Sequence, residues 1–145
     1  MSTSEKALLS VGLRHSDRLI VAQRHTVPEV ETSWPGFSDM PPVLATAMMI
    51  GFVEQTCIEG LRPFLSPEQR TVGTHIDMSH IAATPVGMTV TATVELIGLE
   101  GRALLFNVQC HDETGLIGEG THRRAIIDIN KFMQRLHEKA ALATT

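Results

Sequence analysis

The sequence has few aromatic residues and few cysteines. Its 145 residues include five Phe, one Trp and no Tyr. The two cysteines, Cys57 and Cys110, are too few for the disulfide framework of a small secreted domain, and both lie among apolar residues. We therefore expect buried free thiols and a cytoplasmic location.

The charge balance and the short apolar runs exclude two further classes of protein. Twelve Lys and Arg residues against 16 Asp and Glu residues give a net charge of −4, which argues against general nucleic-acid binding. No segment reaches the roughly 18 apolar residues of a membrane span without also carrying Glu or Arg. We expect neither nucleic acid nor a membrane as a partner.

The remaining composition is that of an ordinary globular domain. Apolar residues make up 43% of the chain and charged residues 19%, and the length favours one domain over residues 1–145. Because aromatic residues are few, aliphatic side chains and the seven Met must fill most of the core. A chain this short has little material to enclose a large pocket, which favours a pocket shared between subunits.

A turn-rich segment follows a first predicted strand over residues 17–26. This segment, residues 27–42, contains Pro28, Pro35, Gly36, Pro41 and Pro42, together with Trp34, Phe37 and Met40. A loop of this length inside a compact domain is usually functional, and exposed aromatic side chains suit a lid or an interface.

The second half of the chain reads as strands, and a long helix precedes it. Residues 42–62 are apolar nearly all round the helical wheel, which predicts a buried helix. Strands are expected over 71–83, 89–96, 104–110 and 116–129, before a short helix from Asn130 to about Lys139. One strand, one long helix and four strands in meander predict an α+β fold of the hot-dog type, an antiparallel sheet wrapped around one helix. Its exposed sheet edge is expected to pair with a second subunit.

Glu54 is the first candidate for chemistry, because it lies in the most apolar part of the predicted helix. A carboxylate there costs several kcal/mol unless it is paired or protonated, and such a group suits a general base or a nucleophile. The alternative is a solvated stripe formed by Glu54, Gln55 and Glu59. Thr46, eight residues earlier, shares a broad face with Glu54 at about 80° around the axis, although a Thr often bonds back to its own helix.

His80 ends the apolar row of the predicted strand over residues 71–83. It is either a satisfied core histidine or an acid–base group facing the helix. On the opposite row, His75 and Asp77 would need further metal ligands that the sequence does not offer, so no metal site is expected. Gly73 indicates a bulge or a close approach of backbone to a ligand, and consecutive Arg123 and Arg124 must point to opposite faces.

Three segments occur in a fairly specific order: PPVLATAMMIGFVEQTCIEGLRPFL, VGTHIDMSHIAATPVGMTVT and IGEGTHRRAIIDINKF. Together they resemble the fluoroacetyl-CoA thioesterase-like family of hot-dog proteins, from about the first strand to the final helix. The resemblance implies hydrolysis of an acyl-CoA thioester, with no cofactor beyond the coenzyme A of the substrate. It also implies a homodimer with its site at the subunit interface, and it leaves open whether dimers pair into tetramers.

The resemblance assigns roles to five residues. The family's catalytic threonine, glutamate and histidine fall on Thr46, Glu54 and His80. The glycine that approaches the thioester carbonyl falls on Gly73, and the arginine of the GTHxR stretch, expected to position the ligand, falls on Arg124.

The lid departs from the fluoroacetate-specific member of the family. That member has two lid phenylalanines; Phe37 matches one, but Met40 occupies the other position. We therefore expect a different short or medium acyl group. Two alternatives are a non-catalytic acyl-CoA binding module and an enoyl-CoA hydratase, which is less favoured because no second acidic residue shares the face of His80.

Overall fold

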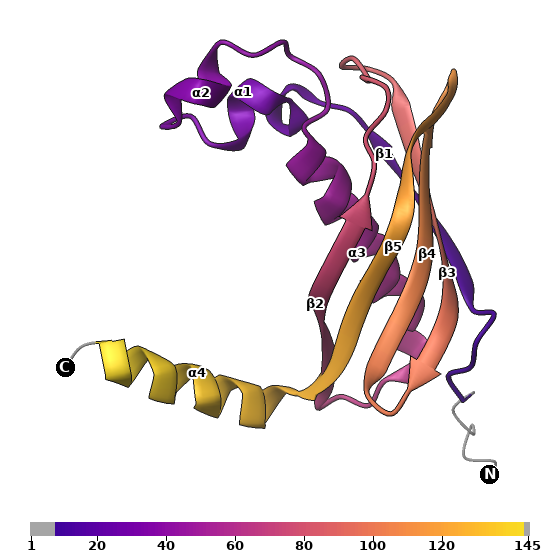
Figure 1. Cartoon of the computed structure of the whole chain (residues 1–145), viewed down its shortest axis with the longest axis vertical. Helices are drawn as coiled ribbons and strands as arrows, with labels where there is room; N and C mark the ends of the chain where they lie inside the picture. Colours follow the sequence, from indigo (N-terminus) through magenta and orange to yellow (C-terminus); the bar gives the residue numbers. More distant parts are fainter. Residues whose placement is uncertain (1–7, 144–145) are drawn as a thin grey trace.

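A computed structural model describes residues 8–143, so both ends of the predicted 1–145 domain lie outside the described part. Five antiparallel strands form one sheet in the order β1-β3-β4-β5-β2. They are β1 (Arg14–Ile20), β2 (Gln69–Met78), β3 (Thr89–Glu100), β4 (Ala103–Asp112) and β5 (Gly115–Asp128). Strands β1 and β2 are therefore the two edges of the sheet (Figure 1).

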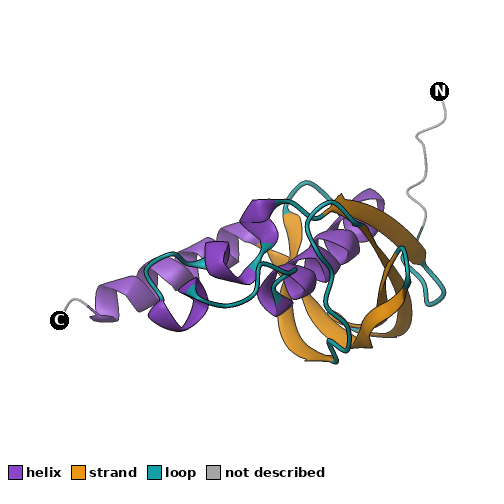
Figure 2. Ribbon diagram, turned by 90° about the horizontal axis from the view of Figure 1, so that it is seen from above, coloured by secondary structure: helices purple, strands orange, loops and turns teal. Residues whose placement is uncertain are grey.

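The sheet curls around one helix, α3 (Thr46–Leu61), as the view from above shows (Figure 2). Met49, Val53, Cys57 and Leu61 recur every four residues and form the fully buried stripe of this helix. Alternating side chains of two strands cover that stripe: Val90, Ala92, Val94 and Leu96 of β3, and Leu104, Phe106, Val108 and Cys110 of β4. The predicted antiparallel sheet wrapped around one helix is confirmed.

The start of the central helix differs from the prediction. The helix begins at Thr46 and not at Pro42, because residues 43–45 are extended and bonded to other segments. The Leu44 N–H donates to the Thr84 carbonyl at 2.9 Å, and Val43 forms a bridge with Pro85. Tertiary pairing therefore holds these residues out of the helix.

The predicted four-strand meander is wrong for β2. Only β3, β4 and β5 follow one another as neighbours, whereas β2 pairs with β5 and β3 pairs with β1. Alternation of apolar and polar residues says that a segment is a strand but not which strand lies beside it. The first strand also ends earlier than predicted, at Ile20.

Two appendages leave the sheet on the side of β2 (Figure 1). The predicted lid folds into α1 (Val27–Val30) and α2 (Pro35–Ser38), after a 3-10 turn, η1 (Gln23–His25). At the other end, a second 3-10 turn, η2 (Arg62–Phe64), follows α3, and α4 (Ile129–Ala143) extends away from β5 without a buried residue. No helix within residues 8–143 is long and apolar enough to cross a membrane.

Candidate active site

The face of α3 opposite its buried stripe is open. Thr46, Ala47, Gly51 and Gln55 are exposed there, so the helix is not buried on all sides as its sequence predicted. The Glu54 side chain lies at the edge of this face and is 42% exposed. The long apolar helix therefore presents an uncovered face beside the edge strand β2.

Glu54 is paired with a buried cation. The Arg124 guanidinium on β5 is 3% exposed, and its Nη1 lies 3.4 Å from Glu54 Oε1. Thr71 on β2 accepts two further bonds from Arg124, on its hydroxyl at 2.9 Å and on its carbonyl at 2.8 Å. Burial lowers the pKa of Arg124, and the Glu54 carboxylate opposes that shift. Arg123 is exposed, which confirms that the two arginines point to opposite faces.

Glu59 provides the contrast that the sequence left open. It pairs with Arg62 at the surface at 3.0 Å, where the Arg62 side chain is 65% exposed. Glu54 instead contacts groups that are almost fully buried. Both carboxylates are partly exposed, Glu54 at 42% and Glu59 at 34%, so they differ in the burial of their partners and not in their own exposure.

His122 belongs to the Glu54 cluster, and the sequence analysis missed it. It is 1% exposed, and its Nε2 lies 3.1 Å from Arg124 Nη1 and 3.8 Å from Glu54 Oε1. Burial lowers its pKa. A signal was available in the sequence: His122 lies two residues before Arg124 in the same strand, so the two side chains share one face of the sheet.

Gly73 lies where β2 passes the Glu54 cluster. A Cβ atom at this position would collide with Glu54 Oε1 and come within 3.2 Å of the His122 ring. The ladder with β5 shifts register between Gly73 and His75, so the strand carries a bulge at Thr74, as the glycine suggested. The bulge also breaks the straight alternation used to place the faces of this strand.

Thr46 and His80 form a second pair. The Thr46 hydroxyl lies 2.8 Å from His80 Nδ1, joining the first residue of α3 to the loop after β2. His80 is therefore not part of the strand, which ends at Met78. Burial lowers its pKa, and the Ala82 backbone partly opposes this shift. Its Nε2 is buried and has no hydrogen-bond partner among residues 8–143.

The two clusters line separate cavities in one chain. Glu54, Gly73 and His122 line a cavity of about 510 Å³, whereas Thr46 and His80 line another of about 320 Å³. Along the α3 axis, the eight residues from Thr46 to Glu54 correspond to about 12 Å. The structure thus brings the predicted residues into two groups and not into one.

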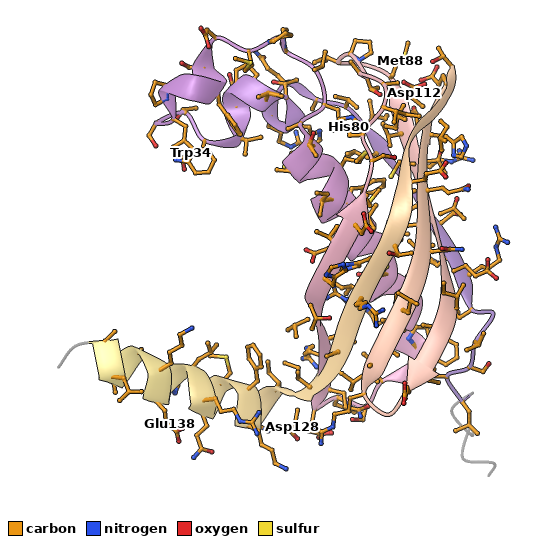
Figure 3. The ribbon with its side chains drawn as sticks, viewed as in Figure 1. Trp34, His80, Met88, Asp112, Asp128 and Glu138 are labelled. Atoms are coloured by element: carbon orange, nitrogen blue, oxygen red, sulfur yellow. The ribbon has the colours of Figure 1, made fainter. Side chains whose placement is uncertain are left out.

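The lid aromatics contact each other. Trp34 and Phe37 pack edge to face with ring centroids 5.2 Å apart. Trp34 is 53% exposed and Met40 is 44% exposed. Trp34 lies on the part of the lid that is away from the sheet, whereas His80 lies beside the sheet (Figure 3). Trp34 and Met40 are therefore on the surface, as a lid or an interface requires, whereas Phe37 is half-buried.

The two cysteines lie in the core. Cys57 and Cys110 are free and buried as predicted, and burial raises their thiol pKa values to about 12 and about 11. Among residues 8–143, no group of three or more His, Cys, Asp or Glu side chains could hold a metal ion.

Comparison with known proteins decides the family. The model of the fluoroacetyl-CoA-specific thioesterase family, FlK, matches residues 21–130. A fluoroacetyl-CoA thioesterase from Streptantibioticus cattleyicolor is 40% identical over 131 residues, which cover 90% of this chain and 94% of the relative. The chain belongs to the FlK family of thioesterases. The resemblance drawn from the three sequence segments is confirmed.

Solved structures agree with this family assignment. A phenylalanine-to-alanine variant of FlK, solved with fluoroacetate and CoA, has a TM-score of 0.84 and 41% identity, covering 86% of this chain and 99% of that chain. A threonine-to-serine variant of FlK, solved with acetyl-CoA, has a TM-score of 0.88 and 39% identity, covering 90% and 98%. A hot-dog-like protein from Thermanaerovibrio acidaminovorans, 21% identical over 89% of this chain and 91% of its own, has a TM-score of 0.76, which supports the hot-dog fold alone.

Proposed function

We propose that this FlK-family chain hydrolyses a short or medium acyl-CoA thioester to the free acid and CoA. The observation that carries the proposal is the 2.8 Å contact between Thr46 and His80, on the same open face of α3 as the Arg124-paired Glu54. This arrangement offers a carboxylate that can attack the thioester carbonyl or activate a water molecule, and an imidazole that can take part in proton transfer.

Glu54 acts on the thioester carbonyl, either as the nucleophile or as the base for a water molecule. With Glu54 as base, the proton taken from the water ends on the departing CoA thiolate; with Glu54 as nucleophile, water then cleaves the acyl–glutamate anhydride and supplies that proton. In both routes His80 donates a hydrogen bond from Nε2 to the leaving sulfur. If the Thr46 hydroxyl donates to Nδ1, the proton of the neutral ring is on Nε2, the buried atom that has no partner in the described part of the chain. A substrate oxygen or sulfur at that point would remove the cost of an unpaired buried N–H.

Gly73 and Arg124 serve the same carboxylate. We assign the Gly73 N–H to the thioester carbonyl, and the absence of a side chain on Gly73 leaves room for Glu54 beside it. Arg124 directs its bonds to Glu54 and Thr71, so we assign it to holding the carboxylate rather than to gripping a distant part of CoA.

We propose a homodimer in which one protomer supplies Glu54 and its partner supplies Thr46 and His80. The separation of about 12 Å along α3 is too long for Glu54 to reach His80 of its own chain. The uncovered face of α3 and the edge strand β2 lie side by side and offer a surface for a second copy. Pairing of dimers into tetramers is a separate question for solution sizing.

Phe37 and Met40 are proposed to contact the acyl group from the lid. By the family resemblance, Met40 replaces a phenylalanine of the fluoroacetate-specific member, and a flexible thioether shapes a less selective wall than a ring. Discrimination between C–H and C–F requires a closely shaped pocket. We therefore propose that a short or medium acyl group other than fluoroacetyl is preferred.

The reaction uses water and needs no cofactor beyond the CoA of the substrate. We propose a cytoplasmic location, because the substrate is a CoA ester and both cysteines are free thiols. Cell fractionation with an antibody against the chain tests this: recovery with the membrane or exported fraction contradicts it.

The decisive experiment measures thiol release from a panel of acyl-CoAs with the purified chain. Glu54→Gln should abolish turnover, whereas the matched variant Glu59→Gln on the same helix should not change it. Equal rates for wild type and Glu54→Gln on every substrate would exclude the proposed thioesterase activity. CoA binding by calorimetry without turnover would indicate a binding module, and loss of enoyl absorbance would indicate a hydratase.

Mixed dimers test the composite site. In the proposal Thr46→Ala and Glu54→Gln homodimers are each strongly impaired, but their heterodimer contains one intact site. If half the dimers are mixed and one of their two sites is active, refolding the two chains together should restore about a quarter of the wild-type rate per dimer. No recovery, with heterodimers demonstrated by mass spectrometry, would place the whole site in one chain.

A further inference from the structure

His122 touches both members of the Glu54–Arg124 pair but has no role in the steps above. It is 1% exposed on β5. Its Nδ1 lies 2.8 Å from the carbonyl oxygen of His75, and its Nε2 lies 3.1 Å from Arg124 Nη1. A buried histidine with both ring nitrogens engaged is held in one orientation.

The partners of the ring determine where its proton is. A backbone carbonyl can only accept a hydrogen bond, so Nδ1 must carry a hydrogen. A guanidinium can only donate, so Nε2 must offer a lone pair to Arg124. Only the neutral Nδ1–H form of His122 satisfies both contacts. Burial and the neighbouring Arg124 lower the pKa of His122, in agreement with this neutral form.

The same guanidinium nitrogen serves two acceptors. Arg124 Nη1 carries two hydrogens and lies 3.1 Å from His122 Nε2 and 3.4 Å from Glu54 Oε1. A hydrogen directed to the imidazole leaves the other directed to the carboxylate. Thr71 accepts from the opposite side of the guanidinium, so His122 and Thr71 together fix its plane.

We propose that His122 is a positioning residue that aims the Arg124 guanidinium at the Glu54 carboxylate. The proposal rests on the proposed function only in taking Glu54 as the catalytic carboxylate. Gly73 belongs to the same arrangement, because a side chain there would contact the His122 ring as well as Glu54. His122 acts through Arg124 in this proposal, although its ring also lines the Glu54 cavity.

A pair of amide variants separates positioning from folding. In His122→Asn the short amide keeps a donor near the Nδ1 position for the His75 carbonyl but cannot reach Arg124. In His122→Gln the longer amide places a carbonyl near the Nε2 position as an acceptor for Arg124. We expect kcat to fall about 10- to 100-fold in His122→Asn, with KM within about twofold, and to be largely recovered in His122→Gln. Equal kcat in the two folded variants would overturn the proposal.

Nitrogen-15 spectra of the wild-type chain test the tautomer without any turnover. We expect the His122 ring to carry its hydrogen on Nδ1 at neutral pH; a hydrogen on Nε2 would overturn the proposal even if both variants fail to fold. A wild type inactive on every acyl-CoA would instead remove the proposed function, and the spectra would still decide the geometry of His122.

Discussion

Gly73 lies so close to Glu54 that a Cβ atom on residue 73 would overlap the carboxylate oxygen Oε1. The glycine is on the edge strand and the glutamate on the central helix, and the bulge at Thr74 follows the contact directly. Close approach of backbone to the carboxylate is therefore built into the point where strand and helix meet.

Gly73→Ala should displace the Glu54 carboxylate and lower kcat by about 10- to 100-fold, because a misplacement of about 1 Å costs on that order. Thiol release from the preferred acyl-CoA measures the effect. The free energy of unfolding provides the control: Gly73→Ala should cost clearly more in wild type than in a Glu54→Ala background, where the colliding atom is absent. Equal costs in the two backgrounds would mean that the collision is relieved elsewhere.

Thr46→Val removes the hydroxyl that contacts His80 while keeping the shape of the side chain. We expect a loss of about 10- to 100-fold in kcat, from a hydrogen bond of about 1–3 kcal/mol. Thr46→Ser should retain most of the activity. Thr56→Val is the matched control on the same helix, because the Thr56 hydroxyl donates to the Phe52 carbonyl of its own helix at 2.8 Å. This variant should change stability rather than kcat. A fully active Thr46→Val would remove Thr46 from the site.

Met40→Phe should restore a second phenylalanine to the lid and narrow the choice of acyl group. The expected result is a higher ratio of kcat/KM for fluoroacetyl-CoA over a longer acyl-CoA, by a factor of about 10, since pocket shape discriminates such groups by roughly 1–3 kcal/mol. Stability should change little, because Met40 is 44% exposed in the chain. An unchanged ratio would show that Met40 does not face the acyl group.

The stability of the fold should decrease below neutral pH. Burial is the first cause that lowers the pKa values of His25, His80 and His122 below 6.5. The unfolded chain then binds more protons than the folded chain, so stability is complete above pH 6.5 and is lost as the pH falls toward the lowered values. Each histidine contributes up to about 1.4 kcal/mol per pH unit within that window.

Urea denaturation at pH 7.5, 6.5 and 5.5, at one protein concentration, measures this loss. His25→Gln should reduce the slope, because His25 Nδ1 accepts the Ala22 N–H at 2.9 Å and cannot do so when protonated. The carboxyl groups with lowered pKa values, Glu31, Glu59 and Asp112, titrate below this range and do not contribute. Constant stability from pH 7.5 to 5.5 would contradict the prediction.

Much of the fold follows from local pattern. The alternation of Val90, Ala92, Val94 and Leu96 predicts a half-buried strand, and these side chains are all buried in β3. The same rule places Arg123 and Arg124 on opposite faces, and the structure shows that Arg124 is the buried one. The order of the strands in the sheet was harder to predict, because the sequences of β2 and β3 both indicate only a strand. Packing around α3 places β2 beside β5 and places β3 between β1 and β4.

The sequence by itself determined the family, the curled sheet around one helix, and the residue types that its chemistry needs, because periodicity and motif order are local properties of the chain. Tertiary structure decided how those residues combine. The helix α3 begins at Thr46 and not at the predicted Pro42, because the preceding residues pair with a distant loop. His80 lies after the end of β2 and not in a strand as predicted, and it contacts Thr46. The tertiary structure also joins His122 to Glu54, because contacts between residues 68 positions apart depend on how the sheet curls and not on either local sequence.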